Sequence, residues 1–154
     1  MKLLRFKKLD SDAMLPTKAY EHDAGFDLIA LHFDYPEDRH TAPYIVTVHT
    51  GLAVEIPEGY VGLLLARSSI YKHNAILSNG VGVIDSGFRG EIIAKFYFQE
   101  LDSWLTFNYK EKFAQLVVVA LPEFEAVLAS DLSESQRGGK GFGSSDRGAS
   151  ANDS

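Results

Sequence analysis

The chain has 154 residues, of which 45% are hydrophobic and 23% are charged, and it contains no cysteine. This composition excludes a wholly disordered chain, a disulfide scaffold and any site that depends on a thiolate. The formal net charge of −6 argues against a protein that binds duplex DNA, which would present a basic face.

The sequence shows no segment that would target the chain to a membrane. The longest apolar stretches, Val61 to Ala66 and Val117 to Leu121, are far shorter than the ~20 residues that a spanning helix needs. The first ten residues lack the sustained apolar core of a secretory signal. We therefore expect a soluble cytoplasmic protein with neither a membrane nor a nucleic acid as partner.

Short runs of β-branched and aromatic residues, separated by turn residues, predict strands along most of the chain. One short helix fits at Ser68 to His73, where Ser68 could cap the first turn. Many short strands with almost no helix predict an antiparallel sandwich or barrel. In chain order, the expected strands are Tyr44 to His49, Leu52 to Ile56, Tyr60 to Ala66, Ala75 to Leu77, Val81 to Ile84, Ile92 to Phe98, Trp104 to Phe107 and Phe113 to Leu121.

The apolar pattern changes near the end of the chain. Residues 1–129 hold nearly all of the aromatic and β-branched side chains, whereas residues 130–154 are rich in glycine and contain one aromatic residue, Phe142. This division predicts a β domain over 1–129 and a flexible arm over 130–154.

Two polar segments could bind an anion. Arg67-Ser68-Ser69 places a guanidinium beside two hydroxyls at the end of an apolar run, and Arg137 to Ser145 places cations and hydroxyls on a glycine-rich backbone. Taken singly, the first segment also fits a helix start with a surface arginine, and the second also fits a disordered tail. Asp85 precedes Ser86-Gly87, where aspartate is common in turns.

Five segments in order resemble the motifs of the trimeric dUTP pyrophosphatases, the dUTPases. They are AGFDL at 24–28, ARSS at 66–69, NGVGVIDSGFRG at 79–90, KFAQL at 112–116 and RGGKGFGSS at 137–145. Lys112-Phe113 replaces the Arg-Ile that is common in the fourth motif. The resemblance implies a jelly-roll-like β-barrel of the β-clip type, and hydrolysis of dUTP to dUMP and pyrophosphate.

The resemblance also implies a role for each matching residue. Asp85 would be the general base that activates water for attack on the α-phosphorus, and Mg²⁺ would bind the phosphates with Asp27 as outer-shell support. The chain would form a homotrimer in which the C-terminal arm of one chain closes over the site of its neighbour. Substrate contacts would come from Arg67, Ser68, Ser69 and Gln115 on the phosphates, Asn79, Gly80 and Gly82 on uracil, Phe88 on the deoxyribose, and Arg137, Phe142, Gly143, Ser144 and Ser145 of the arm.

Two other functions stay open at this point. The hairpin Ile84 to Gly90 also resembles that of dCTP deaminase, but Lys95 lies where the deaminase needs a glutamate to shuttle protons. A nucleotide-binding regulatory protein of the same fold is the second alternative, with Gln99 to Lys110 as a candidate surface.

Overall fold

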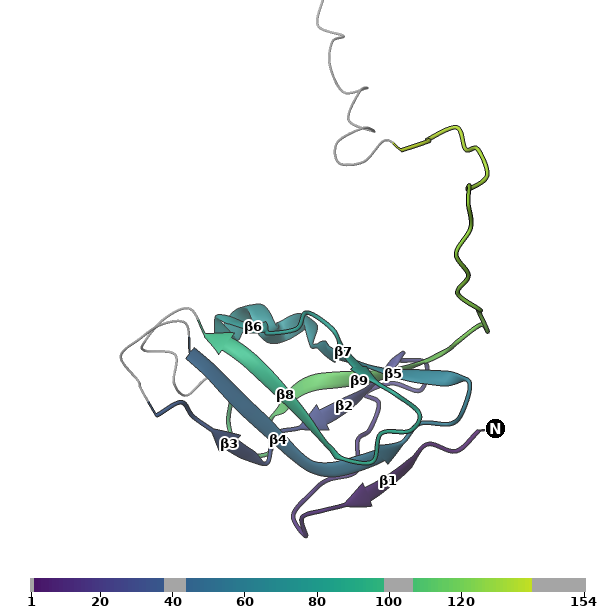
Figure 1. Cartoon of the computed structure of the whole chain (residues 1–154). Helices are drawn as coiled ribbons and strands as arrows, with labels where there is room; N and C mark the ends of the chain where they lie inside the picture. Colours follow the sequence, from purple (N-terminus) through teal and green to yellow (C-terminus); the bar gives the residue numbers. More distant parts are fainter. Residues whose placement is uncertain (1, 38–43, 99–106, 140–154) are drawn as a thin grey trace, which may run out of the picture. The chain divides into compact units, whose positions relative to one another are not determined.

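The structure is a computed structural model that describes residues 2–37, 44–98 and 107–139. Within these ranges the chain forms nine strands and one 3₁₀ helix (Figure 1). Their bounds are β1 Arg5–Lys8, β2 Gly25–Ile29, β3 His32–Asp34, β4 Tyr44–Glu55, β5 Tyr60–Ala66, η1 Ser68–His73, β6 Ala75–Leu77, β7 Gly82–Ile84, β8 Glu91–Phe98 and β9 Lys112–Ala120.

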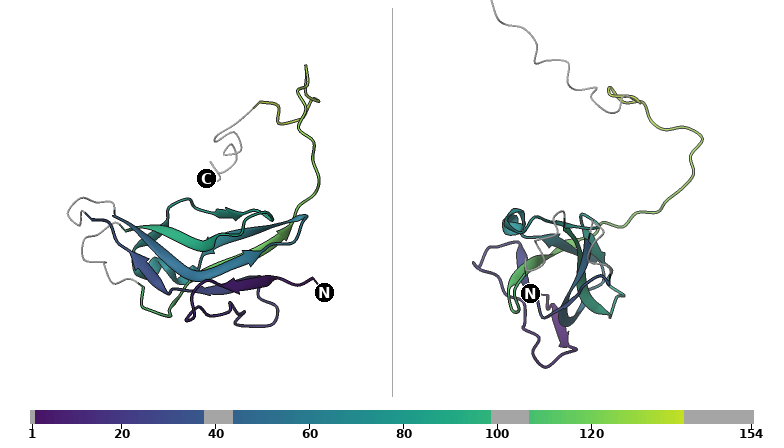
Figure 2. Two further views of the ribbon diagram at one scale, coloured as in Figure 1. Left: turned by 60° about the horizontal axis from the view of Figure 1, so that its bottom comes forward. Right: turned by 90° about the vertical axis from the view of Figure 1, so that its left-hand side faces the viewer.

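The strands form two sheets that face each other (Figures 1 and 2). One sheet has the order β1-β4-β8-β6, with β3 also paired to β4, and the other has the order β2-β9-β5-β7. Every pairing between these strands is antiparallel. The predicted all-β antiparallel architecture is confirmed.

Alternating side chains fill the space between the sheets. In β8 the inward positions are apolar and buried, and Phe96 is fully buried. The ring of Phe96 lies 5.1 Å from that of Phe107 and 6.1 Å from that of Phe113, measured between centroids. These aromatic contacts join β8 to β9 across the core.

Strand β4 runs from Tyr44 to Glu55 without a break. The prediction that Thr50-Gly51 divides this segment into two strands is wrong. The register of β4 with β8 shifts here, and side chains satisfy the backbone groups that the shift leaves unpaired. The buried Thr50 hydroxyl donates to the Ile92 carbonyl at 2.7 Å, and the Gly51 N–H donates to Glu91 Oε1 at 2.7 Å.

Other predicted elements agree with the structure to different degrees. The expected strands at Tyr60 to Ala66 and Ala75 to Leu77 have the same bounds as β5 and β6. The strands β1, β2 and β3 were not expected from the sequence. Most of the strand expected at Trp104 to Phe107 lies outside the described residues.

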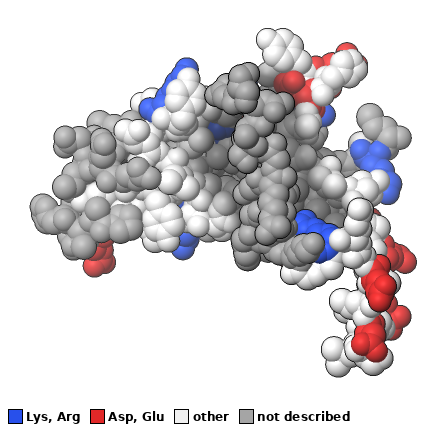
Figure 3. All heavy atoms as spheres, turned by 90° about the horizontal axis from the view of Figure 1, so that it is seen from above, with Lys and Arg blue, Asp and Glu red and all other residues white. Residues whose placement is uncertain are grey.

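Contacts divide the chain into a unit of residues Met1–Glu123 and a second unit of Phe124–Ser154. The described part of the second unit, residues 124–139, has no strand or helix, and its side chains are exposed. Among the described residues, no helix is long and apolar enough to cross a membrane. Lys and Arg side chains are scattered over the face shown in Figure 3, without a continuous basic surface among the residues coloured there.

Candidate active site

Three charged side chains meet at one end of the four-stranded sheet. Asp27 accepts one hydrogen bond from Arg67 Nε at 2.9 Å and another from Lys112 Nζ at 2.8 Å. The Asp27 side chain is only 11% exposed, and these contacts compensate for the removal of its charge from water. Two cations and one carboxylate give this cluster a net charge of 2 − 1 = +1.

The strand order explains why these residues meet. Asp27 on β2 lies opposite Gln115 on β9, and Gln115 lies opposite Leu65 on β5. Arg67 follows β5 directly, and Lys112 begins β9. Residues of the first, second and fourth motifs are therefore brought together within one chain.

Gln115 is held in place by its neighbours. Its Nε2 donates to the Ala66 carbonyl at 3.2 Å. The side chain also lies over Gly25, where an added Cβ would be 2.6 Å from Gln115 Oε1. Glycine at position 25 is therefore required for the observed position of the Gln115 amide.

The helix η1 begins directly after Arg67, which has extended backbone angles of φ −75° and ψ 155°. Arg67 takes the N-cap position, and no side chain caps this helix. The prediction that Ser68 caps the first turn is wrong, because Ser68 is itself the first helical residue. Ser68 is exposed and Ser69 is half-buried. Both serines follow Arg67 of the cationic cluster in the sequence.

A second group of the expected residues surrounds a cavity beside the β7 hairpin. Asn79, Gly82 and Phe88 line this cavity of about 180 Å³, together with Glu91 and apolar residues of β5 and β8. Gly80 lies in the turn before β7, where its N–H donates to the Leu77 carbonyl at 2.9 Å.

The Phe88 ring packs directly on the backbone of the hairpin. An added Cβ at Gly90 would lie 2.6 Å from Phe88 Cζ. The Phe88 ring thus packs against Gly90, which has no side chain in its way. Phe88 also lines the cavity.

Asp85 does not join the cationic cluster within one chain. It follows β7, in which Ile84 pairs with Gly62 near the start of β5. Arg67 follows the opposite end of β5. At ~3.3 Å per residue, the five residues from Gly62 to Arg67 span roughly 17 Å. The backbones of Asp85 and Arg67 are therefore well separated within one chain.

The residues expected on the arm belong to the second unit. Arg137 is followed by a turn in which the Gly138 N–H donates to the Ser135 carbonyl at 3.0 Å. Phe142, Gly143, Ser144 and Ser145 lie outside the described residues.

The sequence reasoning missed two residues of these groups. Lys112 was treated only as a departure from the fourth motif, but it donates to Asp27. Glu91 lines the hairpin cavity, and its position directly after the Ile84 to Gly90 hairpin was a signal that could have identified it. The chain is thus an antiparallel β protein with a cationic cluster at one sheet end and a small-molecule cavity beside a glycine-rich hairpin.

The sequence is similar to known proteins of one family. A family model described as dUTPase matches residues 11–146. The deoxyuridine 5'-triphosphate nucleotidohydrolase of Hydrogenobaculum sp. (strain Y04AAS1) is 38% identical over 149 residues, which cover 94% of this chain and 97% of the relative. That of Escherichia phage T5 is 37% identical over 149 residues, which cover 93% and 98%.

A solved structure is also similar. The dUTPase of Staphylococcus bacteriophage 80alpha with dUpNHpp has a TM-score of 0.76 and 30% sequence identity, and the match covers 94% of this chain and 99% of that chain. Together with the match of the family model over most of the sequence, this shows that the chain belongs to the dUTPase family.

Proposed function

We propose that this protein hydrolyses dUTP to dUMP and pyrophosphate. The observation that carries the proposal is the cluster of Asp27, Arg67 and Lys112 beside Gln115, in a chain of the dUTPase family. A triphosphate is strongly anionic, and the chain has a net charge of −6. A local excess of positive charge is what such a substrate requires.

The phosphates are bound by side chains around Arg67. Its Nε and Nη1 bond to Asp27 and to the Lys112 carbonyl, and a guanidinium has five N–H donors, so others remain for phosphate oxygens. The hydroxyls of Ser68 and Ser69 and the amide of Gln115 complete the contacts from this end of the sheet.

The nucleoside is bound in the hairpin cavity. Asn79 and the backbone at Gly80 and Gly82 recognise the uracil edge, and the narrow space excludes the methyl group of thymine. Phe88 packs on the deoxyribose and leaves no room for a 2′-hydroxyl. The lining of the cavity by Asn79, Gly82 and Phe88 supports a nucleoside at this place.

Asp85 is the general base of the reaction. Its carboxylate takes a proton from water as the water oxygen forms a bond to the α-phosphorus. The bond from that phosphorus to the bridging oxygen of the β-phosphate breaks in line, and pyrophosphate leaves with the electron pair. Most of the rate enhancement comes from positioning and from charge stabilisation of the phosphates.

The complete site forms in a homotrimer. The separation of Asp85 from Arg67 along β5 supports a site in which the hairpin of one chain faces the cationic cluster of another. The C-terminal arm completes a neighbouring site: Phe142 stacks on uracil, Arg137, Ser144 and Ser145 bind the γ-phosphate, and Gly143 allows close approach of the backbone.

Magnesium accompanies the substrate. Among the described residues, no group of three or more His, Asp or Glu could hold a metal ion. Each carboxylate oxygen of Asp27 accepts one hydrogen bond. A carboxylate has about four acceptor sites, so Asp27 can also accept a hydrogen bond from a water molecule bound to the metal ion. When bound, Mg²⁺ supplies positive charge to the phosphates. The protein acts in the cytoplasm.

The deaminase alternative is not favoured. Lys95 occupies the position where that reaction needs a glutamate, and its side chain is exposed on β8, opposite the buried face. An ammonium group at this position cannot replace the carboxyl group in proton transfer.

Pyrophosphate release from dUTP, dCTP, dTTP and UTP tests the proposal. We expect rapid release from dUTP alone. With Asp85→Asn we expect almost no release from dUTP, whereas dUpNHpp binding is kept because no phosphate contact is removed.

Truncation after Ser135 leaves a folded protein with badly impaired turnover. Ammonia release from dCTP would indicate the deaminase, and binding without turnover would indicate the regulatory protein.

A further inference from the structure

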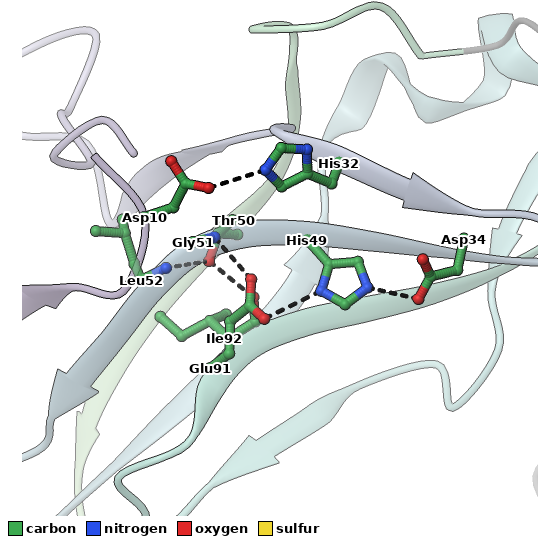
Figure 4. A network of polar contacts seen from close by, with 9 residues as sticks. All are labelled: Asp10, His32, Asp34, His49, Thr50, Gly51, Leu52, Glu91 and Ile92. Atoms are coloured by element: carbon green, nitrogen blue, oxygen red, sulfur yellow. Dashed lines mark hydrogen bonds and ion pairs between the residues drawn. The ribbon is translucent and has the colours of Figure 1, made fainter. Parts of the chain in front are cut away.

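A histidine on β4 lies between two carboxylates from the neighbouring strands (Figure 4). His49 Nε2 is 2.8 Å from Asp34 Oδ2 on β3, and His49 Nδ1 is 3.0 Å from Glu91 Oε2 on β8. Ionised carboxylates only accept hydrogen bonds, so both contacts are satisfied when both ring nitrogens carry a proton. The geometry therefore favours the imidazolium form of His49, whose side chain is 23% exposed.

The partner on β8 has a second role. Glu91 Oε1 accepts a hydrogen bond from the Gly51 N–H at 2.7 Å, at the register shift of β4. One oxygen of Glu91 thus binds His49 and the other binds the β4 backbone. These contacts fix the first residue of β8 against β4.

Glu91 also belongs to the hairpin cavity. It lines the same space as Asn79 and Phe88, and it follows Gly90, on which the Phe88 ring packs. Any movement of Glu91 changes the wall of that cavity. His49 therefore contacts a residue, Glu91, that lines the proposed nucleoside site.

Several other charged groups face His49. His32 lies directly opposite it in the pairing of β3 with β4 and binds Asp10 at 3.0 Å. Asp10, His32, Asp34, His49 and Glu91 line one cavity of about 340 Å³. Lys95 lies further along β8 on the outward face, opposite Thr47. With three carboxylates around it, loss of the His49 proton leaves their mutual repulsion uncompensated.

We infer that His49, held as an imidazolium between Asp34 and Glu91, is a positioning residue for nucleotide binding, because it fixes the Glu91 wall of the hairpin cavity. This inference rests on the proposed function. It makes nucleotide affinity dependent on the protonation of a residue that does not contact the nucleotide.

The protonation of His49 responds to its surroundings. Burial acts to lower the pKa of His49, but the hydrogen bonds to Glu91 and Asp34 together outweigh it and raise the pKa above its ordinary value of 6.5. The imidazolium form is therefore favoured below the ordinary pKa of histidine, and the network opens as the pH rises through the raised pKa.

Binding of dUpNHpp to the full chain tests the inference, compared between wild type, His49→Gln and the control His32→Gln. At about pH 6 we expect His49→Gln to bind about fivefold more weakly than wild type, a typical size for coupling between sites. The Kd values of the two proteins should converge at high pH, whereas His32→Gln should follow wild type. Parallel pH profiles for wild type and His49→Gln would overturn the inference.

A measurement on wild type alone avoids any folding defect of the variant. By reciprocity, dUpNHpp must raise the pKa of His49 if protonation favours binding. Titration of the His49 ring resonances by NMR, with and without dUpNHpp, gives that shift. A pKa that does not change, in a protein that hydrolyses dUTP, overturns this inference alone. A chain that neither binds dUpNHpp nor hydrolyses dUTP overturns the proposed function as well.

Discussion

Arg67 directly follows the last residue of β5, whereas Asp85 follows β7, near the other end of β5. Asp85 follows the residue that pairs with Gly62, and Arg67 follows Ala66, the last residue of the strand. Both residues are required by the proposed reaction, in which Arg67 would bind phosphate and Asp85 would activate water. The proposal that two chains contribute these residues to one site can be tested directly.

Mixing two inactive variants should restore activity. Arg67→Gln and Asp85→Asn chains each lack one half of the site, but a mixed trimer places the intact Arg67 of one chain against the intact Asp85 of another. Random co-refolding of equal amounts should recover roughly a quarter of wild-type turnover, because half of the chains carry each intact residue. Pyrophosphate release from dUTP measures it, and a mixture as inactive as its components would place both residues of a site in one chain.

Lys112 should contribute to substrate affinity. Lys112→Met removes one of the two cations beside Asp27 and lowers the net charge of the cluster from +1 to 0. We expect the KM for dUTP to rise about tenfold. A larger effect is not expected, because solvent screens the charge of this half-exposed lysine. Lys112→Arg preserves the charge and serves as the control. A KM that is equal in the methionine and arginine variants would contradict the role given to this cation.

Gly25 should be intolerant of a side chain. In Gly25→Ala the new Cβ would lie 2.6 Å from Gln115 Oε1. Because Oε1 is the far end of a flexible side chain, we expect the Gln115 amide to move, with a loss of at most about 1 kcal/mol in the free energy of unfolding, measured by urea denaturation, and an increased KM for dUTP. In the double variant Gly25→Ala with Gln115→Ala, the contact with Oε1 is removed and only that with the Gln115 Cβ at 3.2 Å remains, so the penalty of the Gly25 change should be reduced. Additive losses in this double-mutant cycle would exclude the contact as its cause.

The stability of the fold should depend on pH through His49. Its pKa is raised in the folded chain above the ordinary value of 6.5. The stabilisation is therefore complete below about pH 6.5 and is lost as the pH rises through the folded pKa. Urea midpoints of wild type should decline over this range, whereas those of His49→Gln should lack that component. His22→Gln, which changes an exposed histidine, should behave as wild type; equal slopes in all three proteins would disprove the effect.

The strands that the sequence pattern predicts best are apolar runs with clear ends. Tyr60 to Ala66 and Ala75 to Leu77 match β5 and β6 because turn residues bound them. Strand β1 was missed because three of its four residues are exposed cations, which give no apolar alternation. Strand β2 was missed because it begins with Gly25 and carries a charged residue, Asp27, on a buried position.

The motifs select candidate site residues, but they do not predict how these residues are arranged. The motifs identified Arg67, Gln115 and Asp85, because each motif is local in the sequence. The contact between Asp27 and Lys112 joins residues that are 85 positions apart, and it depends on which strands pair and in which register. Local periodicity contains no information about that choice, and it likewise could not show that Asp85 and Arg67 lie near different ends of β5.

The separation of Asp85 from Arg67 along β5 also has a consequence for when the protein could act. In the proposed trimer a single chain carries every group that the reaction needs, but its Asp85 and its Arg67, which lie near different ends of β5, would belong to different sites. Catalysis would thus begin only on encounter with further copies, and specific activity would fall on dilution below the concentration at which they stay associated. One defective copy would also silence sites that it shares with intact neighbours.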